Sequence, residues 1–244
     1  MEYLILDETV STNSFIKKNR EALSAPLLVR AVSQTGGRGQ RGNSWEAAPG
    51  ENLTFSILWK PEGIAPREQF AVSEAVALGV VSYLSSRGIG SRVKWPNDIY
   101  VGDRKICGIL IEHSVTGMEL DQSIIGVGVN VNQIRFLSDA PNPVSMSMLT
   151  GEVYSLDHEM HAVGEEIAMF LGLASASGER DGLHREFMRL LWRGDDRSYP
   201  FRDCLENRIY AGKIADVEPS GHIIIMDEDG TLRKYAFKEI EFML

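Results

Sequence analysis

Residues 27–59, LLVRAVSQTGGRGQRGNSWEAAPGENLTFSILW, decide how the N-terminal half of the chain folds. Gly37, Gly39 and Gly42 match the G-x-G-x-x-G pattern of a dinucleotide-binding turn. That pattern requires a helix directly after the glycines, because the N-terminus of the helix binds the pyrophosphate. Here a Pro-Gly pair at 49–50 and a second β-rich run follow instead. The stretch therefore predicts two strands joined by a long glycine-rich loop, and the dinucleotide match is coincidental.

Two arginines, Arg38 and Arg41, lie inside this loop. Glycines leave backbone amides accessible, and guanidinium groups are bidentate donors for carboxylate or phosphate. The composition therefore favours a loop that closes over an anionic ligand. The alternative is a mobile surface loop with solvated arginines, and these residues alone do not exclude it.

The whole chain has an ordinary globular composition: 244 residues, of which 43% are hydrophobic and 24% charged. This length allows one large domain, or one domain and a small module. The net charge of -9 argues against a protein that coats nucleic acid, which needs a broad basic surface. The cysteines and histidines show no ligand spacing, so neither a disulfide framework nor a protein metal site is predicted. No long apolar run is present, and we expect a cytoplasmic protein without membrane contact.

Strand patterns cluster in consecutive runs with few helices between them. A Gly-Asp turn at 102–103 joins two of the runs as a hairpin. This order favours an α+β fold with a mixed, largely antiparallel sheet and flanking helices. Short strands with turns over 195–244 predict a second, small β domain after a main domain over 1–194. Strands are expected at 3–8, 27–32, 53–59, 90–95, 99–101, 105–113 and 123–132, and helices at 11–23, 67–87, 157–173 and 179–192.

Polar residues gather at a strand end in KWPND (94–98), where the proline forces a bend. This cluster is either part of a site or a turn with Asx hydrogen bonds. Lys105 follows the hairpin turn and opens an apolar strand, so it is either a site cation or a solvated hairpin lysine. Gly108 within that strand indicates close approach by a ligand or another backbone. Cys107 is expected on the same strand face as Lys105, as a reactive or a buried thiol.

The run GVGVNVN (126–132) alternates valines with glycines and asparagines. One strand face is therefore apolar, and the other is nearly bare, with amides at its end. A face bared by two glycines is either the floor of a groove or a surface packed tightly against a helix.

The order of these motifs is more specific than any one of them. STNS (11–14) before a helix, SQTGGRGQRGNSW (33–45) between strands, KWPND (94–98) with GDRKICGILIE (102–112), and GVGVNVN (126–132) together strongly resemble a biotin protein ligase, also called biotin acetyl-CoA-carboxylase ligase. The resemblance implies a class II synthetase-like catalytic domain followed by a small SH3-like β-barrel. Longer members of the family carry an N-terminal winged helix that represses transcription. Because STN begins so close to the N-terminus, we expect the short form without this DNA-binding domain.

The resemblance also implies a reaction. Biotin and MgATP would give biotinyl-5'-AMP and pyrophosphate, and a specific lysine of a biotin carboxyl carrier domain of a biotin-dependent carboxylase would then attack the adenylate. Such a protein would bind no specific DNA and no membrane, and it would be a monomer or a homodimer. Two alternatives stay open: a lipoate or octanoate ligase or transferase of the same fold, and a non-enzymatic biotin-binding sensor.

Two residues would be catalytic by this resemblance. Arg38 and Lys105 would neutralise the biotin carboxylate and the α-phosphate of ATP, two anions that repel each other. Gln40 departs from some relatives, which have arginine there, and a second cationic contact to the adenylate is therefore in doubt. Arg41 beside it could compensate.

The other implied residues bind substrates, and no protein-held metal site is expected. Neutral donors and acceptors suit the ureido ring of biotin, and an aromatic ring suits adenine. Ser11, Thr12, Asn13 and Gln34 would bind the ureido ring, Trp45 would stack on adenine, Asn97, Asp98 and Asn130 would lie near the nucleotide and its Mg²⁺, and Gly37, Gly39, Gln40, Arg41 and Gly108 would complete the site.

Overall fold

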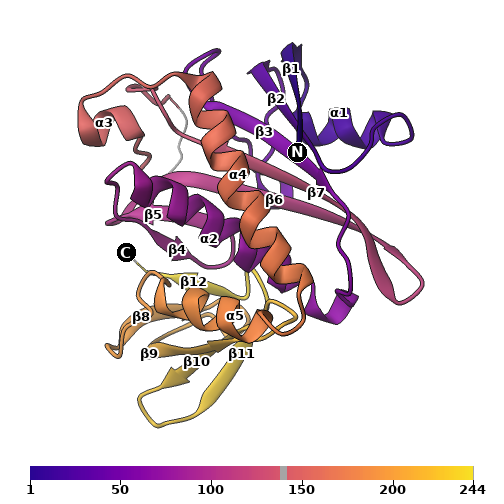
Figure 1. Cartoon of the computed structure of the whole chain (residues 1–244). Helices are drawn as coiled ribbons and strands as arrows, with labels where there is room; N and C mark the ends of the chain where they lie inside the picture. Colours follow the sequence, from indigo (N-terminus) through magenta and orange to yellow (C-terminus); the bar gives the residue numbers. More distant parts are fainter. Residues whose placement is uncertain (138–141, 244) are drawn as a thin grey trace.

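A computed structural model describes residues 1–137 and 142–243, apart from the Arg41 side chain, and contains two β-sheets with flanking helices (Figure 1). The larger sheet has seven strands in the order β1-β2-β3-β7-β6-β5-β4. β1 and β2 pair in parallel, and its other neighbouring strands pair antiparallel. The predicted mixed, largely antiparallel sheet is therefore confirmed. The strands are β1 (Glu2–Thr9), β2 (Leu27–Gln34), β3 (Leu53–Trp59), β4 (Arg92–Lys94), β5 (Asp98–Val101), β6 (Arg104–Thr116) and β7 (Glu119–Val129).

The glycine-rich loop runs between two antiparallel strands, β2 and β3, as the sequence predicts. It contains a three-residue 3-10 turn, Gln40–Gly42, where a dinucleotide-binding fold would have a long helix. Backbone hydrogen bonds from Gly39 N to Asn43 O (2.7 Å) and from Trp45 N to Gly37 O (3.0 Å) close the loop into a small hairpin. The dinucleotide-binding interpretation is excluded by this topology.

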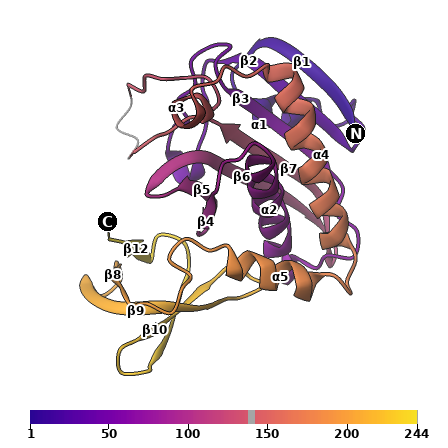
Figure 2. The ribbon, with the colours of Figure 1, turned by 60° about the vertical axis from the view of Figure 1, so that its left-hand side comes forward.

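Helices cover the two faces of the large sheet unequally (Figure 2). On one face α2 (Phe70–Ser86) and α4 (Leu156–Ser175) form the main hydrophobic core with the sheet. They cross closely, since a Cβ at Gly79 would lie 2.7 Å from the Cα of Ile167. On the other face α1 (Thr12–Asn19) buries Ile16 against a smaller cluster and covers only part of the sheet. The uncovered part of this second face is where the cavity described below lies.

Two further helices lie outside these layers. α5 (Arg180–Arg189) contacts α2 and α4 and leads to the C-terminal strands. The helices predicted at 67–87, 157–173 and 179–192 are confirmed as α2, α4 and α5, whereas α3 (Met146–Thr150) is a short helix that the sequence analysis did not predict. Ser145 caps α3 by accepting a hydrogen bond from the Met148 amide at 3.2 Å.

The C-terminal strands form a second, antiparallel sheet in the order β11-β10-β9-β8-β12. It packs firmly on the rest of the chain. Trp95 Nε1 donates to the Gly221 carbonyl oxygen at 3.1 Å, and the Phe70 amide donates to the Pro219 carbonyl oxygen at 3.2 Å. The second sheet is confirmed, and the division into domains at 194/195 stays a prediction. The strands are β8 (Tyr199–Asp203), β9 (Arg208–Val217), β10 (Ile223–Asp227), β11 (Leu232–Tyr235) and β12 (Ile240–Phe242).

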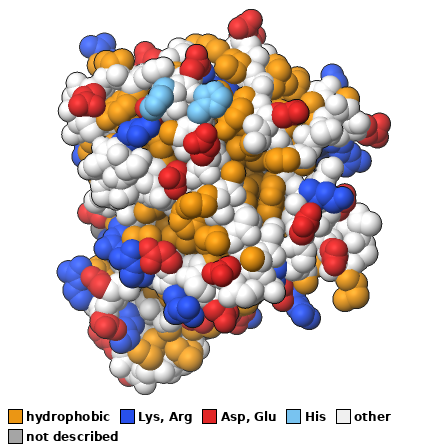
Figure 3. Space-filling model, viewed as in Figure 1, with side chains coloured by type: hydrophobic (Ala, Val, Ile, Leu, Met, Phe, Trp, Pro, Cys, Tyr) orange, Lys and Arg blue, Asp and Glu red, His pale blue; other side chains and the backbone are white. Residues whose placement is uncertain are grey.

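The surface on the α2–α4 side mixes charges of both signs with apolar side chains, and this face shows no broad basic area (Figure 3). Within residues 1–137 and 142–243, none of the helices combines the length and apolar character needed to cross a membrane.

Candidate active site

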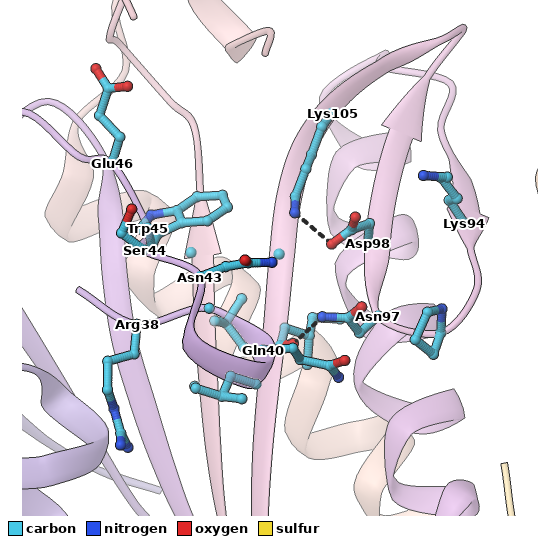
Figure 4. Close-up of a pocket in the computed structure, with 18 of the residues that line it drawn as sticks. Arg38, Gln40, Asn43, Ser44, Trp45, Glu46, Lys94, Asn97, Asp98 and Lys105 are labelled. Atoms are coloured by element: carbon cyan, nitrogen blue, oxygen red, sulfur yellow. Dashed lines mark hydrogen bonds and ion pairs between the residues drawn. The ribbon is translucent and has the colours of Figure 1, made fainter. Parts of the chain in front are cut away.

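A cavity of about 1120 Å³ lies over the uncovered part of the large sheet, between the glycine-rich loop and the C-terminal sheet (Figure 4). Most of the predicted site residues line it together. Gly37 lies just behind the wall, where a Cβ would approach the Trp45 carbonyl oxygen to 2.6 Å. The Arg41 side chain falls outside the described part of the structure. The predicted residues that line the cavity are Ser11, Thr12, Asn13, Gln34, Arg38, Gly39, Gln40, Trp45, Asn97, Asp98, Lys105, Gly108 and Asn130.

Three glycines form the cavity floor. Gly108 and Gly128 are register partners on β6 and β7, and the Trp45 ring lies against both. A Cβ on Gly128 would come within 2.3 Å of the ring, and one on Gly126 would come within 2.5 Å of the Asn13 side-chain oxygen. The bare face of β7 is thus a groove floor over one part of its length and a close helix contact at the other. The two interpretations left open by the sequence both hold: Gly128 belongs to the groove floor, and Gly126 packs against α1.

One end of the cavity, the neutral end, is lined by Thr12, Asn13 and Gln34, with the buried Ser56 behind them. Ser11 caps α1 by accepting a hydrogen bond from the Ser14 amide at 3.1 Å, and this fixes the first turn above the sheet. The Thr12 amide donates to Gln34 Oε1 at 2.8 Å.

Ser56 supports the neutral end from behind the cavity lining, and the sequence analysis missed it. Its hydroxyl is fully buried, donates to Asn13 Oδ1 at 2.5 Å and lies 2.6 Å from Thr12 Oγ1. A hydroxyl inside the otherwise apolar strand LTFSILW is the signal that could have found it. On the neighbouring strand its register partner is Gly126, which leaves room above it.

The other end, the charged end, is made of Asp98, Lys105 and Asn130. Lys105 Nζ forms an ion pair with Asp98 Oδ1 at 2.6 Å and lies 5.6 Å from the centre of the Trp45 ring. Asn130 is buried; its side-chain amide donates to the Val144 carbonyl oxygen at 3.1 Å. Its Oδ1 atom has no hydrogen-bond partner among the described residues.

Asn97 has a structural role beside the charged end. Its side-chain amide donates to the Ile109 carbonyl oxygen at 2.7 Å, and the Ile109 amide donates back to the Asn97 carbonyl oxygen at 2.9 Å. These bonds fix the bend of KWPND against β6, so that Asp98 is held facing Lys105 (Figure 4).

The expectation that Lys105 and Cys107 share a strand face is wrong. Ile99 pairs with Cys107 and Tyr100 pairs with Lys105, so β6 carries one extra residue at this point. This bulge turns Lys105 toward the cavity and leaves Cys107 fully buried in the core. Burial raises the pKa of the Cys107 thiol well above its ordinary value. The inert interpretation of this cysteine is therefore favoured.

The two predicted catalytic cations lie apart. Arg38 points away from Lys105 and Asp98 (Figure 4). Its Nη2 atom instead contacts Glu112 Oε2 at 3.0 Å. Gln40 lines the cavity with a neutral side chain on the side of Asn97.

Lys94 and the C-terminal sheet also contribute to the wall. The sequence analysis placed Lys94 in the KWPND cluster without a role of its own, and it gave the C-terminal residues none. Lys94 Nζ contacts Tyr100 Oη at 3.2 Å and lies 4.9 Å from the centre of that ring. Burial lowers the pKa of Lys94, and the Asp98 charge opposes this shift. From the C-terminal sheet come Cys204, Phe237, Lys238, Ile240, Glu241 and Phe242. Long-range packing creates this wall, and local sequence carries no signal for it.

A buried neutral end, a charged end and an aromatic ring between them fit an enzyme that joins a ring-bearing carboxylic acid to a nucleotide. The chain belongs to the biotin/lipoate A/B protein ligase family, whose model matches residues 6–130.

Similar proteins support this assignment along most of the chain. The bifunctional ligase/repressor BirA of Bacillus subtilis is 32% identical, over 96% of this chain and 73% of its own length. That of Salmonella typhimurium is 28% identical, over 94% and 71%. Among solved structures, the biotin protein ligase of Aquifex aeolicus in complex with biotin and ATP has a TM-score of 0.80 at 23% identity, with 99% of this chain and 98% of that chain covered. At this identity the structural likeness shows the fold.

Proposed function

We propose that this protein attaches biotin to a specific lysine of a biotin carboxyl carrier domain at the expense of ATP. In the first half-reaction a carboxylate oxygen of biotin attacks the α-phosphorus of ATP, which forms biotinyl-5'-AMP and releases pyrophosphate. In the second, the lysine ε-amine attacks the acyl carbon, a C–N bond forms, and AMP leaves. A relative from Paracoccus denitrificans with 33% identity over 52% of this chain and 53% of its own is named biotin-[acetyl-CoA-carboxylase] ligase.

The observation that carries this proposal is the contrast between the two ends of one cavity. The neutral end offers uncharged amide and hydroxyl groups, which suit the ureido ring of biotin. Lys105 stands at the charged end, where the carboxylate and the α-phosphate must meet. Trp45 lies on the glycine floor between them and offers an indole face for the adenine.

Lys105 and Asp98 have different roles at the charged end: Lys105 contacts the phosphate, and Asp98 positions Lys105. While the site is empty, Asp98 holds the Lys105 ammonium in place by the ion pair. An arriving phosphate competes for that ammonium and gives it a second anionic partner. The Mg²⁺ that accompanies ATP would be held by the Asp98 carboxylate and by the otherwise unpartnered Asn130 Oδ1, and it would neutralise phosphate charge.

A lipoate or octanoate substrate is the alternative within the family. Neither an apolar dithiolane nor an alkyl chain can form hydrogen bonds with the neutral end. Asn13 and the half-buried Gln34 would then face a group that offers them no hydrogen bond, and enzymes discriminate against ligands that remove water from polar groups without pairing them. The geometry therefore favours biotin.

The test is ATP–pyrophosphate exchange with each candidate acid in turn, followed by transfer to an isolated carrier domain. We expect exchange with biotin and mass addition on one carrier lysine. Exchange with lipoate or octanoate and none with biotin would refute the proposal. Biotin binding without pyrophosphate release would instead identify a sensor.

A further inference from the structure

Glu112, on β6, joins the glycine-rich loop to the neutral end of the cavity. Its Oε2 atom accepts hydrogen bonds from Arg38 Nη2 and from Asn13 Nδ2, both at 3.0 Å. Its Oε1 atom accepts one from Lys17 Nζ at 3.3 Å. One carboxylate therefore contacts side chains from the loop, from the first turn of α1 and from its last turn.

The charge balance around Glu112 allows Arg38 to leave. Burial raises the pKa of Glu112, but the Asn13 hydrogen bond and the Arg38 and Lys17 charges outweigh it, so the pKa lies below its ordinary value. At neutral pH the carboxylate is ionised and faces two cations. If Arg38 moves away, Lys17 and the Asn13 amide still satisfy the carboxylate, and no charge is left without a partner.

The pair between Arg38 and Glu112 is also weak enough to exchange. The Arg38 side chain is 47% exposed and that of Glu112 is 27% exposed, and water screens such a pair. A phosphate or carboxylate inside the cavity offers a guanidinium a less hydrated, bidentate partner. An anionic ligand should therefore win the competition for Arg38.

On the basis of the proposed function, we propose that Glu112 is a positioning residue that holds Arg38 in the cavity wall, turned away from Lys105 and Asp98, until the acyl-adenylate forms. The geometry makes this retention sensitive to substrate, because the same Oε2 atom orients Asn13 against the ring-binding end. When the adenylate is present, Arg38 exchanges Glu112 for the ligand, and the loop closes over the reactive anhydride.

The test is limited trypsin digestion of the whole empty protein, with the initial rate of cleavage after Arg38 read by mass spectrometry. Glu112→Gln keeps an acceptor for Asn13 and removes the charge that holds Arg38. We expect it to be cleaved about 1.5- to 5-fold faster there than wild type, the range for a partly exposed ion pair. Lys17→Gln is the matched control, since it removes a different partner of the same carboxylate, and its cleavage after Arg38 should stay at the wild-type rate.

A second measurement does not depend on the folding of a variant. In wild type, raising the salt from about 0.05 M to about 1 M shortens the screening length to roughly 3 Å and should speed cleavage after Arg38 relative to other sites. In Glu112→Gln this salt effect should vanish. With biotin and MgATP both proteins should be protected, because the ligand then holds Arg38.

Two results would overturn the inference. One is equal cleavage of empty wild type and Glu112→Gln at both salt concentrations. The other is loss of ligand protection in Glu112→Gln, which would place Glu112 in the closed state. The digestion of empty protein needs no substrate, so absence of pyrophosphate release by wild type would refute the proposed function separately.

Discussion

The two ends of the cavity satisfy their polar groups in different ways. At the neutral end, side chains bond to one another: the buried Ser56 hydroxyl donates to Asn13, and the buried Thr12 hydroxyl donates to the half-buried Gln34. At the charged end, Lys105 and Asp98 form an ion pair that is partly exposed, and the Asn130 oxygen has no partner among the described residues.

This difference indicates how each end contributes to the reaction. The neutral end is organised before substrate arrives, so its contacts should be the same in the ground state and in the transition state. The charged end must exchange internal partners for phosphate as charge develops during adenylation. Changes at the neutral end should therefore raise KM for biotin, and changes at the charged end should lower kcat.

The largest effect is expected from Lys105→Ala. The substitution removes a charge-assisted contact worth about 1.5–3 kcal/mol, which corresponds to roughly ten- to a hundred-fold slower adenylate formation. It should act on kcat and leave KM for biotin nearly unchanged. Single-turnover pyrophosphate release measures this split.

Arg104→Ala is the matched control, because Arg104 is the neighbouring cation and its side chain is exposed at the hairpin. Attack of a carrier domain on preformed biotinyl-adenylate should suffer less in Lys105→Ala than adenylation does. A wild-type rate of adenylation in Lys105→Ala would show that Lys105 is a solvated hairpin lysine without a role in adenylation.

A smaller effect, on KM for biotin and not on kcat, is expected from Ser56→Ala. It leaves the buried Asn13 oxygen without its donor, and an unsatisfied buried acceptor costs about 1–2 kcal/mol. KM for biotin should rise about 5- to 30-fold, with kcat at saturating biotin nearly unchanged. Steady-state kinetics with biotin as the varied substrate measure it, and Ser33→Ala on β2 is a hydroxyl control outside the cavity lining. If kcat falls and KM does not rise, the two ends do not differ as argued.

The loop, the start of α1 and several site residues could be predicted from the sequence, because the patterns that indicate them are local. The glycine-rich run between two β-patterns identified the loop, the capping cluster identified the start of α1, and the resemblance assigned Asn13, Lys105 and Trp45 to one site. Turn, cap and strand patterns depend on residues that are close together in the sequence, so they can be read from the sequence directly.

What the sequence could not give depends on register and long-range packing. Ser56 reaches Asn13, behind the cavity lining, because β3 pairs with β7 in the register that places it beside Gly126. Cys107 leaves the site because a bulge in β6 adds one residue, and simple alternation then places it on the wrong face. The α3 helix has five residues, too few to show a helical period. The cavity wall from the C-terminal sheet is set by docking of distant segments.

The contact between the C-terminal sheet and the helices is a third region of interest. Weakening it should affect the charged end of the cavity and not the neutral end. His184 on α5 contacts Glu74 Oε1 on α2 at 2.7 Å and Asp216 Oδ1 on β9 at 3.0 Å. It thereby ties the C-terminal sheet to the helices that cover the large sheet. The sheet lines the cavity beside Lys94, whose Nζ lies 5.9 Å from the centre of the Phe242 ring.

The smallest expected effect tests this link by pH. The hydrogen bond to Glu74 raises the pKa of His184 from its ordinary value of 6.5 to about 9, and burial raises the pKa of Glu74. Because the folded-state pKa of His184 is raised, its stabilisation is fully present below about pH 6.5 and is lost as the pH rises through about 9. His184→Gln should lower the free energy of unfolding by about 1–2 kcal/mol at pH 6, discounted for a side chain one-third exposed, and by little at pH 10. His158→Gln, at an exposed histidine beside Glu159, is the control. Urea unfolding at the two pH values measures the difference.

In the same variant KM for ATP should rise about two-fold at pH 6 while KM for biotin stays constant. An equal rise in both constants would mean that the C-terminal sheet supports the whole cavity, and the separation of its two ends would then fail.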